Sequence, residues 1–380
     1  MLIVLILLLA VLCAANYYIA LRLWQGARHL FPCIRLWPIL VIFFLLLVVM
    51  GLSFSRSFLP FGPGAKHVIG VIGSYWMAIF IYLLLFTMVA DLVYWISRLF
   101  RGSFAEGGVF RLVSGIVILL FTAGTVFFGS FHTRQVKHVS YDISLESLPV
   151  QEEMTLVLIS DLHLGAIGSE ARLEGIVREI NSRKPDLVCI AGDFFDTDFS
   201  AIQDPDKAVA LLQTISATHG VYACLGNHDA GPTAEKMLTF LKSCNIRVLR
   251  EEATVIDGKL ILAGRLDASP IGGYGEAKRQ EFSAVLADAD PNLPVVVMDH
   301  NPANIGGYGE ESDLILSGHT HKGQLFPANF MTDLLYEVDY GYYRKDSSSP
   351  HVIVTSGVGF WGMPIRVGTD CEIVTIILHP

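Results

Sequence analysis

Acidic residues are almost absent from the first 138 residues of this 380-residue chain. That part holds ten Lys and Arg against two Asp and Glu, whereas residues 139–380 hold seventeen against thirty-four. The net charge of −9 is therefore the sum of about +8 and −17. The second part lacks the basic excess of nucleic-acid-binding domains, which argues against nucleic acid as the main partner. The split indicates two physically different environments.

Closely spaced cysteines are lacking as well. The six cysteines form no CxxC pair and show no short regular spacing: Cys13, Cys33, Cys189, Cys224, Cys244 and Cys371. This excludes a zinc finger and a disulfide-rich scaffold. Cys189 and Cys224 lie within apolar runs, so we expect them to be buried in a core.

Residues 1–138 contain long apolar runs with few charged residues. Four stretches are long enough to cross a hydrocarbon core, which needs about 20 apolar residues: 2–24, 38–59, 68–96 and 108–131. The first stretch lacks the basic start and the small-residue cleavage site of a signal peptide, so we interpret it as a retained span. The sequence predicts an integral protein of the cell (inner) membrane, with an all-α four-helix transmembrane domain at 1–138.

Basic residues between the spans predict an orientation. The loops after the first and third spans hold six arginines and the opposite side holds four basic residues: Arg22, Arg28, Arg35, Arg98, Arg101 and Arg111, against Arg56, Lys66, Arg134 and Lys137. Positive residues favour the cytoplasmic side, so the second part is expected to be extracytoplasmic. Asp91, the one acid within a span, is interpreted as a headgroup-level residue beside Arg98.

From about residue 150 the sequence alternates between strands and helices. Strand-length apolar runs occur at 154–160, 186–192, 221–226, 295–298, 314–318, 351–357 and 371–378. Helical spacing follows the first three runs, at 173–180, 207–215 and 233–243. Asp257-Gly258 predicts a hairpin turn. This alternation is typical of α/β architecture, and we place a linker at 139–153 and a catalytic domain at 154–380.

Polar residues follow five of these strands. The blocks are Ser160-Asp161-Leu162-His163, Gly192-Asp193, Gly226-Asn227-His228-Asp229, Asp299-His300 and Gly318-His319-Thr320-His321. In open α/β sheets, ligands bind beyond the carboxyl ends of the strands. Carboxylate, amide and imidazole donors without thiolate suit Mn, Fe or Zn. Seven such donors are too many for one ion and suit two if one carboxylate bridges them.

The order D-x-H, GD, GNHD, a later His and GHTH resembles the calcineurin-like metallophosphoesterase superfamily over about 155–378. The segment TSGVGFWGMPIRVGTDCEI is similar to the closing segment of a bacterial membrane-associated branch. The resemblance implies an α/β (α+β) sandwich of two mixed β-sheets flanked by helices. It implies two divalent metal ions, the first held by Asp161, His163 and His321, the second by Asn227, His300 and His319, with Asp193 bridging them.

The resemblance also implies two catalytic residues. His228 would lie over the phosphate and assist the reaction, and Asp229 would orient its ring, with plain packing as the alternative. Lys322 departs from the GHTHGGQ found in many relatives, and we expect it to face water rather than substrate phosphate. The repeated segment IGGYGE, at 271–276 and 305–310, is interpreted as flexible loops without chemistry.

These features predict a membrane-anchored phosphoesterase with a binuclear metal centre. It would hydrolyse a phosphate ester or pyrophosphate bond of a small molecule or lipid by attack of a metal-activated water. The superfamily includes enzymes that cleave UDP-2,3-diacylglucosamine, which makes a lipid substrate an analogy-level expectation. The alternative is a membrane transporter or sensor component whose metal domain binds without turnover. The spans hold few polar residues that could line a transport path, which favours the enzyme.

Overall fold

The computed structural model describes residues 2–55, 59–101, 107–145, 153–165, 167, 169–196 and 199–380. Arg56 and residues 146–152 of the predicted linker lie outside the described residues. The chain divides into two compact units, Met1–Ser130 and Phe131–Pro380.

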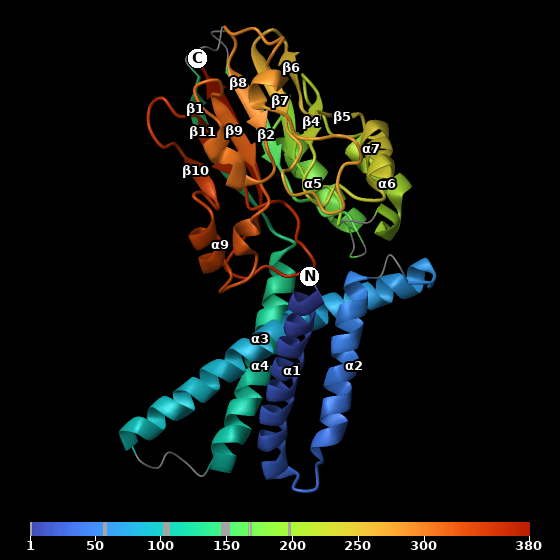
Figure 1. The fold of residues 1–380 in the computed structure, drawn as a ribbon, viewed down its shortest axis with the longest axis vertical. Coiled ribbons are helices and arrows are strands. Elements are labelled where there is room, and N and C mark those ends of the chain that lie inside the picture. The colour runs from blue at the N-terminus through green and yellow to red at the C-terminus, as the bar shows by residue number, and fades with distance from the viewer. Residues whose placement is uncertain are drawn as a thin grey trace. The chain divides into compact units, whose positions relative to one another are not determined.

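The first unit is helical. Its described residues form α1 (Leu2–Leu30), α2 (Leu36–Phe54), α3 (Pro63–Arg101) and α4 (Gly107–His132), which Figure 1 shows as long rods. All four are long and apolar enough to cross a membrane, which confirms the predicted spans. Side chains such as Phe43, Leu47 and Trp76 pack between the helices, while others such as Phe127 face outward. Apolar outer faces are typical of helices whose solvent is lipid.

Asp91 pairs with two other helices rather than with Arg98. Its Oδ2 accepts hydrogen bonds from the Tyr18 hydroxyl at 2.7 Å and from Arg22 Nε at 2.8 Å, and its Oδ1 pairs with Arg111. These contacts join α1, α3 and α4. A buried acid gains from paired cations the stabilisation that it loses with its hydration shell.

The second unit contains two six-stranded sheets. The first has the order β1-β12-β2-β3-β4-β5 and the second β10-β11-β9-β8-β7-β6. The first sheet comprises β1 (Val136–Ser144), β2 (Met154–Ile159), β3 (Leu187–Ala191), β4 (Val221–Cys224), β5 (Ile246–Val248) and β12 (Cys371–His379). The second comprises β6 (Glu252–Ile256), β7 (Leu260–Gly264), β8 (Val295–Met298), β9 (Leu314–Ser317), β10 (Gly341–Tyr343) and β11 (His351–Val354). Both sheets are mixed, because β12 runs antiparallel to β2, and β6 and β10 run antiparallel to their neighbours.

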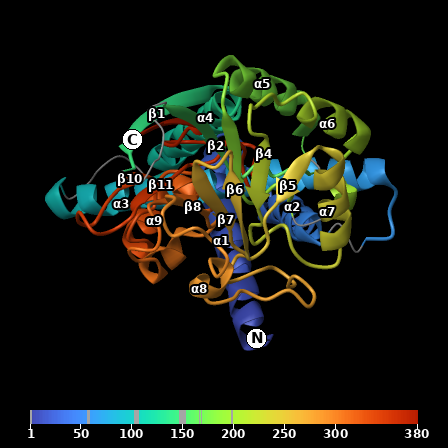
Figure 2. The same cartoon turned by 90° about the horizontal axis from the view of Figure 1, so that it is seen from above.

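The sheets pack face to face and carry helices outside, as Figure 2 shows from above. Between them lies a core to which the first sheet gives Leu158, Cys189 and Cys224 and the second gives Leu262 and Met298. The helices α5 (Ser169–Ser182), α6 (Pro205–Leu212) and α7 (Ala234–Ser243) pack on the outer face of the first sheet, and α8 (Phe282–Val285) packs on that of the second. The predicted sandwich and the buried cysteines are confirmed.

Parallel pairing brings the predicted site blocks to common edges. Within the first sheet, Ile159 lies opposite Ile190 and Ala191 opposite Cys224, so β2, β3 and β4 end together. In the second sheet, β8 and β9 also pair in parallel. The predicted hairpin between β6 and β7 is confirmed, with Asp257 and Gly258 at φ 50° and 69°.

The strand β1 lies across the junction that the sequence predicts between residues 138 and 139. It pairs in parallel with β12 over its whole length, from Val136 opposite Cys371 to Ser144 opposite His379. Residues 139–144 of the predicted linker are therefore part of the first sheet.

We expect Asp91→Asn to destabilise the first unit, because it leaves Arg22 and Arg111 without their shared carboxylate. Since both arginines are partly exposed, the loss should be about 1–3 kcal/mol, below that for a fully buried pair. Thermal unfolding of the purified protein in detergent measures this, with Asp142→Asn on the exposed side of β1 as the control. Equal melting temperatures for the two variants would contradict the expectation.

Candidate metal centre

The seven predicted metal donors follow the carboxyl ends of five strands, as the sequence pattern predicts. Asp161 and His163 follow β2, Asp193 follows β3, Asn227 follows β4, His300 follows β8, and His319 and His321 follow β9. All are buried except His319, which is half-buried. Both sheets thus contribute donors to one place.

The donors form two groups. In the first, His321 Nε2 lies 3.1 Å from His163 Nε2 and 3.3 Å from Asp161 Oδ1. In the second, His300 Nε2 lies 3.1 Å from Asp193 Oδ2 and 3.2 Å from His319 Nδ1. The potential ligand atoms within each group all lie within 4.8 Å of one another.

Asn227 and Asp193 complete the arrangement. The side-chain oxygen of Asn227 lies 3.0 Å from His319 Nδ1, in the second group. Asp193 Oδ2 is 3.1 Å from His300 Nε2 and 3.7 Å from His163 Nε2, so it lies between the two groups. The Asp193 carboxylate is therefore close to a ring nitrogen of each group.

These residues fit a pair of divalent cations. Ligand atoms that bind one ion at 2.0–2.2 Å are about 3 Å apart in octahedral geometry, close to the separations within each group. Asp161 Oδ1 and His163 Nδ1 are buried without a hydrogen-bond partner among the described residues. Buried polar atoms of this kind require an explanation, and for Asp161 Oδ1 a cation supplies one.

Electrostatics in the site favour positive charge. Burial raises the pKa of Asp161, but His321, His163 and His300 outweigh it and hold that pKa well below its usual range. Burial likewise raises the pKa of Asp193, but His300, His228 and His163 together outweigh burial and lower it. Burial and His300 lower the pKa of His319 to about 4. Burial also lowers the pKa of His321, whereas the neighbouring carboxylates raise the pKa of His163 and His300. Ionised carboxylates are the form that binds a metal, and a bound cation displaces protons from imidazole rings.

The backbone is strained at the same residues. Asp161, His163, Asp193, His319 and His321 all have φ between 46° and 72°, in the left-handed region. A side chain with a Cβ pays about 1–2 kcal/mol for this conformation. Such residues cluster at functional sites, where the surrounding structure holds them in place.

Glycine precedes three of the donors, Asp193, Asn227 and His319, because no Cβ would fit there. A Cβ at Gly226, before Asn227, would collide with Asp193 Oδ1, and one at Gly318, before His319, would collide with the side chain of Ser160. The loops that follow β3 and β4, and those that follow β2 and β9, can approach closely only with glycine at these positions.

The two predicted catalytic residues lie at the site, but Asp229 does not orient the His228 ring. The Asp229 carboxylate accepts backbone N–H bonds from Phe195 at 3.1 Å and Gly226 at 2.9 Å, so it holds together the loops that carry Asp193 and Asn227. The carboxylate near the His228 ring is that of Asp196. Burial lowers the pKa of His228, which favours the neutral ring.

Asp196 and Arg366 contribute to the site, and the sequence analysis missed both. Asp196 could have been found as the last residue of the run Gly192–Asp196, GDFFD, three positions after Asp193. Arg366 is completely buried and donates to the carbonyl oxygens of His321 at 3.2 Å and Gly359 at 2.7 Å. Nothing in the pattern around Arg366 indicates that its partner is the backbone of a predicted ligand.

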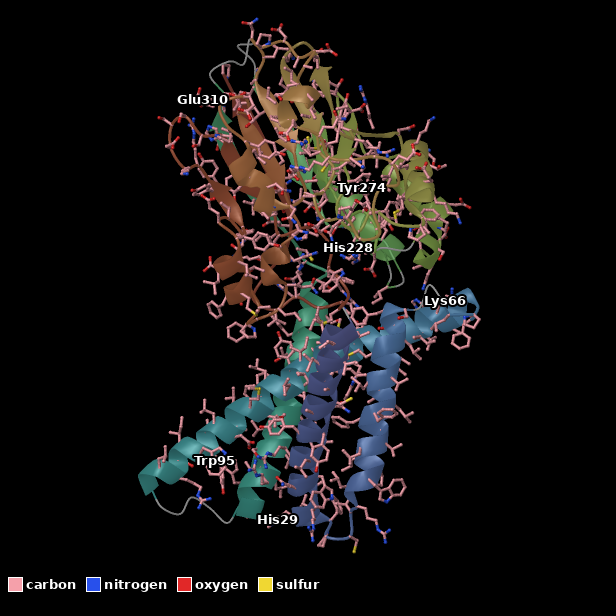
Figure 3. All side chains as sticks on the ribbon, viewed as in Figure 1. His29, Lys66, Trp95, His228, Tyr274 and Glu310 are labelled. Atoms are coloured by element: carbon pink, nitrogen blue, oxygen red, sulfur yellow. The ribbon has the colours of Figure 1, made fainter. Side chains whose placement is uncertain are left out.

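The IGGYGE repeats are not flexible loops without a role. The Tyr274 hydroxyl of the first copy donates to the Gly226 carbonyl at 2.7 Å, directly before Asn227. The Tyr308 hydroxyl of the second copy donates to Asp299 Oδ2 at 2.6 Å, directly before His300. Each tyrosine therefore holds the residue that precedes a donor of the second group. Figure 3 labels Tyr274 and His228.

Lys322 is half-buried. Its ammonium lies 4.0 Å from the centre of the Tyr340 ring, a cation–π contact.

We expect Gly226→Ala to weaken metal binding, because the added Cβ displaces the Asp193 carboxylate. The clash should also cost about 1–3 kcal/mol of stability. Metal analysis after dialysis against manganese, together with thermal unfolding, measures both effects. Gly175→Ala in α5 is the matched control, since no atom lies within 4 Å of its added Cβ. Undiminished manganese in Gly226→Ala would contradict the close approach.

We expect Tyr274→Phe to weaken binding of the second ion, because it leaves the buried Gly226 carbonyl with one fewer donor, at a cost of about 1–3 kcal/mol. Tyr308→Phe should act in the same direction through Asp299. Titration calorimetry with manganese measures the two affinities. Tyr342→Phe, on the exposed strand β10, should bind as the unaltered protein does. A loss of stability with both affinities unchanged would show that the tyrosines only support the fold.

Comparisons with known proteins point to a phosphoesterase family. The sequence profile of the family described as "Calcineurin-like phosphoesterase" matches residues 154–323. A metallophosphoesterase of Helicobacter pylori is 31% identical over 61% of this chain, and the chain spans 61% of that relative's length. A UDP-2,3-diacylglucosamine pyrophosphatase, LpxG, of Chlamydia trachomatis is 25% identical over 55% of this chain and 78% of its own.

One relative also covers the helical part. The "Transmembrane protein with metallophosphoesterase domain" of Danio rerio is 30% identical over 90% of this chain and 80% of its own length. Together with the four apolar helices, this likeness identifies a membrane protein. The chain belongs to the calcineurin-like phosphoesterase family.

Proposed function

We propose that this protein is a membrane-anchored, metal-dependent hydrolase of phosphate esters or pyrophosphate bonds. The observation that carries the proposal is the position of Asp193 Oδ2, within 3.7 Å of a ring nitrogen from each group of donors. In the proposed domain organisation, residues 1–138 carry the membrane anchor and 154–380 the catalytic domain, and the predicted linker 139–153 contributes residues 139–144 to the first sheet through β1.

We assign the metal ligands by group. Asp161, His163 and His321 hold the first ion, Asn227, His300 and His319 hold the second, and Asp193 bridges them. A pair of divalent cations supplies Lewis acidity, which activates water and stabilises charge on phosphoryl oxygens. Mn, Fe and Zn all suit the donor set.

The chain's own residues have three tasks in this proposal. The ligand loops hold their donors in place, since the hydrogen bonds of Asp229 and Arg366 fix the loop backbones despite the strain at the donors. The ring of His228, neutral near pH 7, donates its N–H as a hydrogen bond to a phosphoryl oxygen, whereas transfer of a proton to the leaving oxygen would require the protonated ring. Asp196 lies within reach of that ring and orients it, the role that the family resemblance implied for Asp229.

A lipid-linked substrate is the finer part of the proposal. Its supports are the membrane spans and the likeness to a relative named as a pyrophosphatase of a diacylated sugar nucleotide. The basic residues of the loops favour a cell-membrane protein whose second unit lies on the extracytoplasmic side. A substrate on that side is a phosphorylated lipid rather than a lipid linked to a cytosolic nucleotide.

Asp193→Asn should abolish hydrolysis, because it removes the charge that the two ions share. A loss of several kcal/mol of transition-state stabilisation corresponds to a fall of about 10³ or more in kcat. The measurement is release of nitrophenol from a chromogenic phosphodiester by the full chain with manganese, and Glu310→Gln, on an exposed loop, is the control.

Two results would contradict the proposal in different ways. Full activity of Asp193→Asn would contradict the bridging role. Two bound ions in the unaltered protein, without hydrolysis of a broad panel of phosphate esters and pyrophosphates, would favour a sensor that binds metal without turnover.

A further inference from the structure

The short helix α9 (Asn329–Leu335) presents large apolar side chains to the outside. Leu334 is 86% exposed, Leu335 72%, Phe330 64% and Met331 63%. Single exposed apolar residues need no explanation, but a contiguous group marks a surface that another apolar phase covers. We call these four residues the α9 face. In Figure 1, α9 lies at the periphery of the second unit, beside β10.

The polarity of α9 is inverted. At 100° per residue, the four apolar side chains occupy one half of the helix circumference, and Asn329 and Thr332 lie on the other half. The Thr332 hydroxyl donates to Asp339 Oδ2 at 2.8 Å, within the protein. A helix on the surface of a soluble domain does the reverse, with its apolar stripe inward and its polar residues in water.

The helix is attached to the candidate metal centre. Asp339, which binds Thr332, also accepts a hydrogen bond through its backbone oxygen from the Thr320 hydroxyl at 2.6 Å. Thr320 lies between His319 and His321. The Tyr336 ring, directly after α9, packs edge-on against the His319 ring, with 6.2 Å between their centres. Whatever covers the α9 face is therefore close to the site.

We propose that the α9 face inserts into the surface of the lipid bilayer. A bilayer is already present beside this protein, because the helices of its first unit are membrane spans. Only residues 133–135 separate α4 from β1, and three residues span at most about 10 Å, so the bilayer stays within reach of the second unit. A second protein, by contrast, would have to be supplied in addition.

The composition around the α9 face suits shallow insertion. An amphipathic helix lies in the plane of the interface, with its apolar half about 5–10 Å deep and its polar residues in water. Asp333 lies in the polar half with Asn329 and Thr332, compatible with that depth. The Lys322 ammonium and the Tyr340 ring, in contact with each other, are the residue types found at headgroup level.

This inference goes beyond the proposed hydrolysis and does not depend on it. Where both hold, the metal centre operates at the lipid surface, and a substrate with acyl chains reaches it without leaving the bilayer.

The test places a nitroxide spin label at Leu334→Cys in the full chain, with the two exposed cysteines, Cys13 and Cys33, replaced by serine. The protein is reconstituted in nanodiscs of phosphatidylethanolamine and phosphatidylglycerol. Oxygen concentrates in lipid and a nickel chelate stays in water, so we expect relaxation by nickel about five-fold weaker, and by oxygen stronger, than at a water-exposed position. Val255→Cys, an exposed apolar position on β6, is the matched control.

Equal nickel accessibility at positions 334 and 255 would overturn the proposal. Strong spin–spin coupling between labels on two chains, with relaxation by oxygen no stronger than at position 255, would overturn it in favour of a second copy on this face. Circular dichroism and manganese content report whether the labelled chain is folded. Phe330→Cys, on the same face, gives an independent label position with the same expected result.

Discussion

The Asp193 carboxylate links the ligand loops of the first sheet to those of the second. It follows a strand of the first sheet, yet its Oδ2 lies 3.1 Å from His300, which follows a strand of the second. The other nitrogen of that ring lies 2.7 Å from the carbonyl oxygen of Ala191, at the end of β3. Its Oδ1 accepts the His228 backbone N–H at 2.8 Å, in the loop after β4. A buried carboxylate is costly unless charges and hydrogen bonds surround it. Asp193 therefore constrains the loops after β3, β4 and β8 together.

The sequence was sufficient for the parts of the site that depend on strand register. Buried parallel strands end at a common edge, so the residues after 159, 191 and 224 had to lie together, and the resemblance to a family then grouped the donors. The partners of single side chains were not predictable in the same way. Asp229 follows His228 in the chain, but its carboxylate turns toward the amides of Gly226 and Phe195, a choice that tertiary packing makes. The tyrosines of the IGGYGE repeats were missed because glycine-rich segments read locally as loops, whatever their aromatic residue contacts.

The membrane unit gave a similar result. Apolar runs of more than 18 residues located all four helices, because only a helix can satisfy its own backbone within lipid. The partners of Asp91 could not be predicted from the sequence. Arg98 is the basic residue near it in the chain, whereas Arg22 and Arg111 come close to it only when three helices have packed. Helix α9 was equally hidden, because a stretch of seven residues shows no periodicity that separates an inward from an outward apolar face.

The pairing of β12 has a consequence for the order of folding. Because β12 lies between β1 and β2, the first sheet stays split until residues 371–379 have left the ribosome, although the four hydrophobic helices are synthesised long before. The core between the sheets, to which Val374, Ile376 and Leu378 belong, therefore closes late. Until then the nascent chain is attached to the membrane and β2 lacks its neighbour β12. An unpaired strand edge of this kind can pair with other chains unless it is protected.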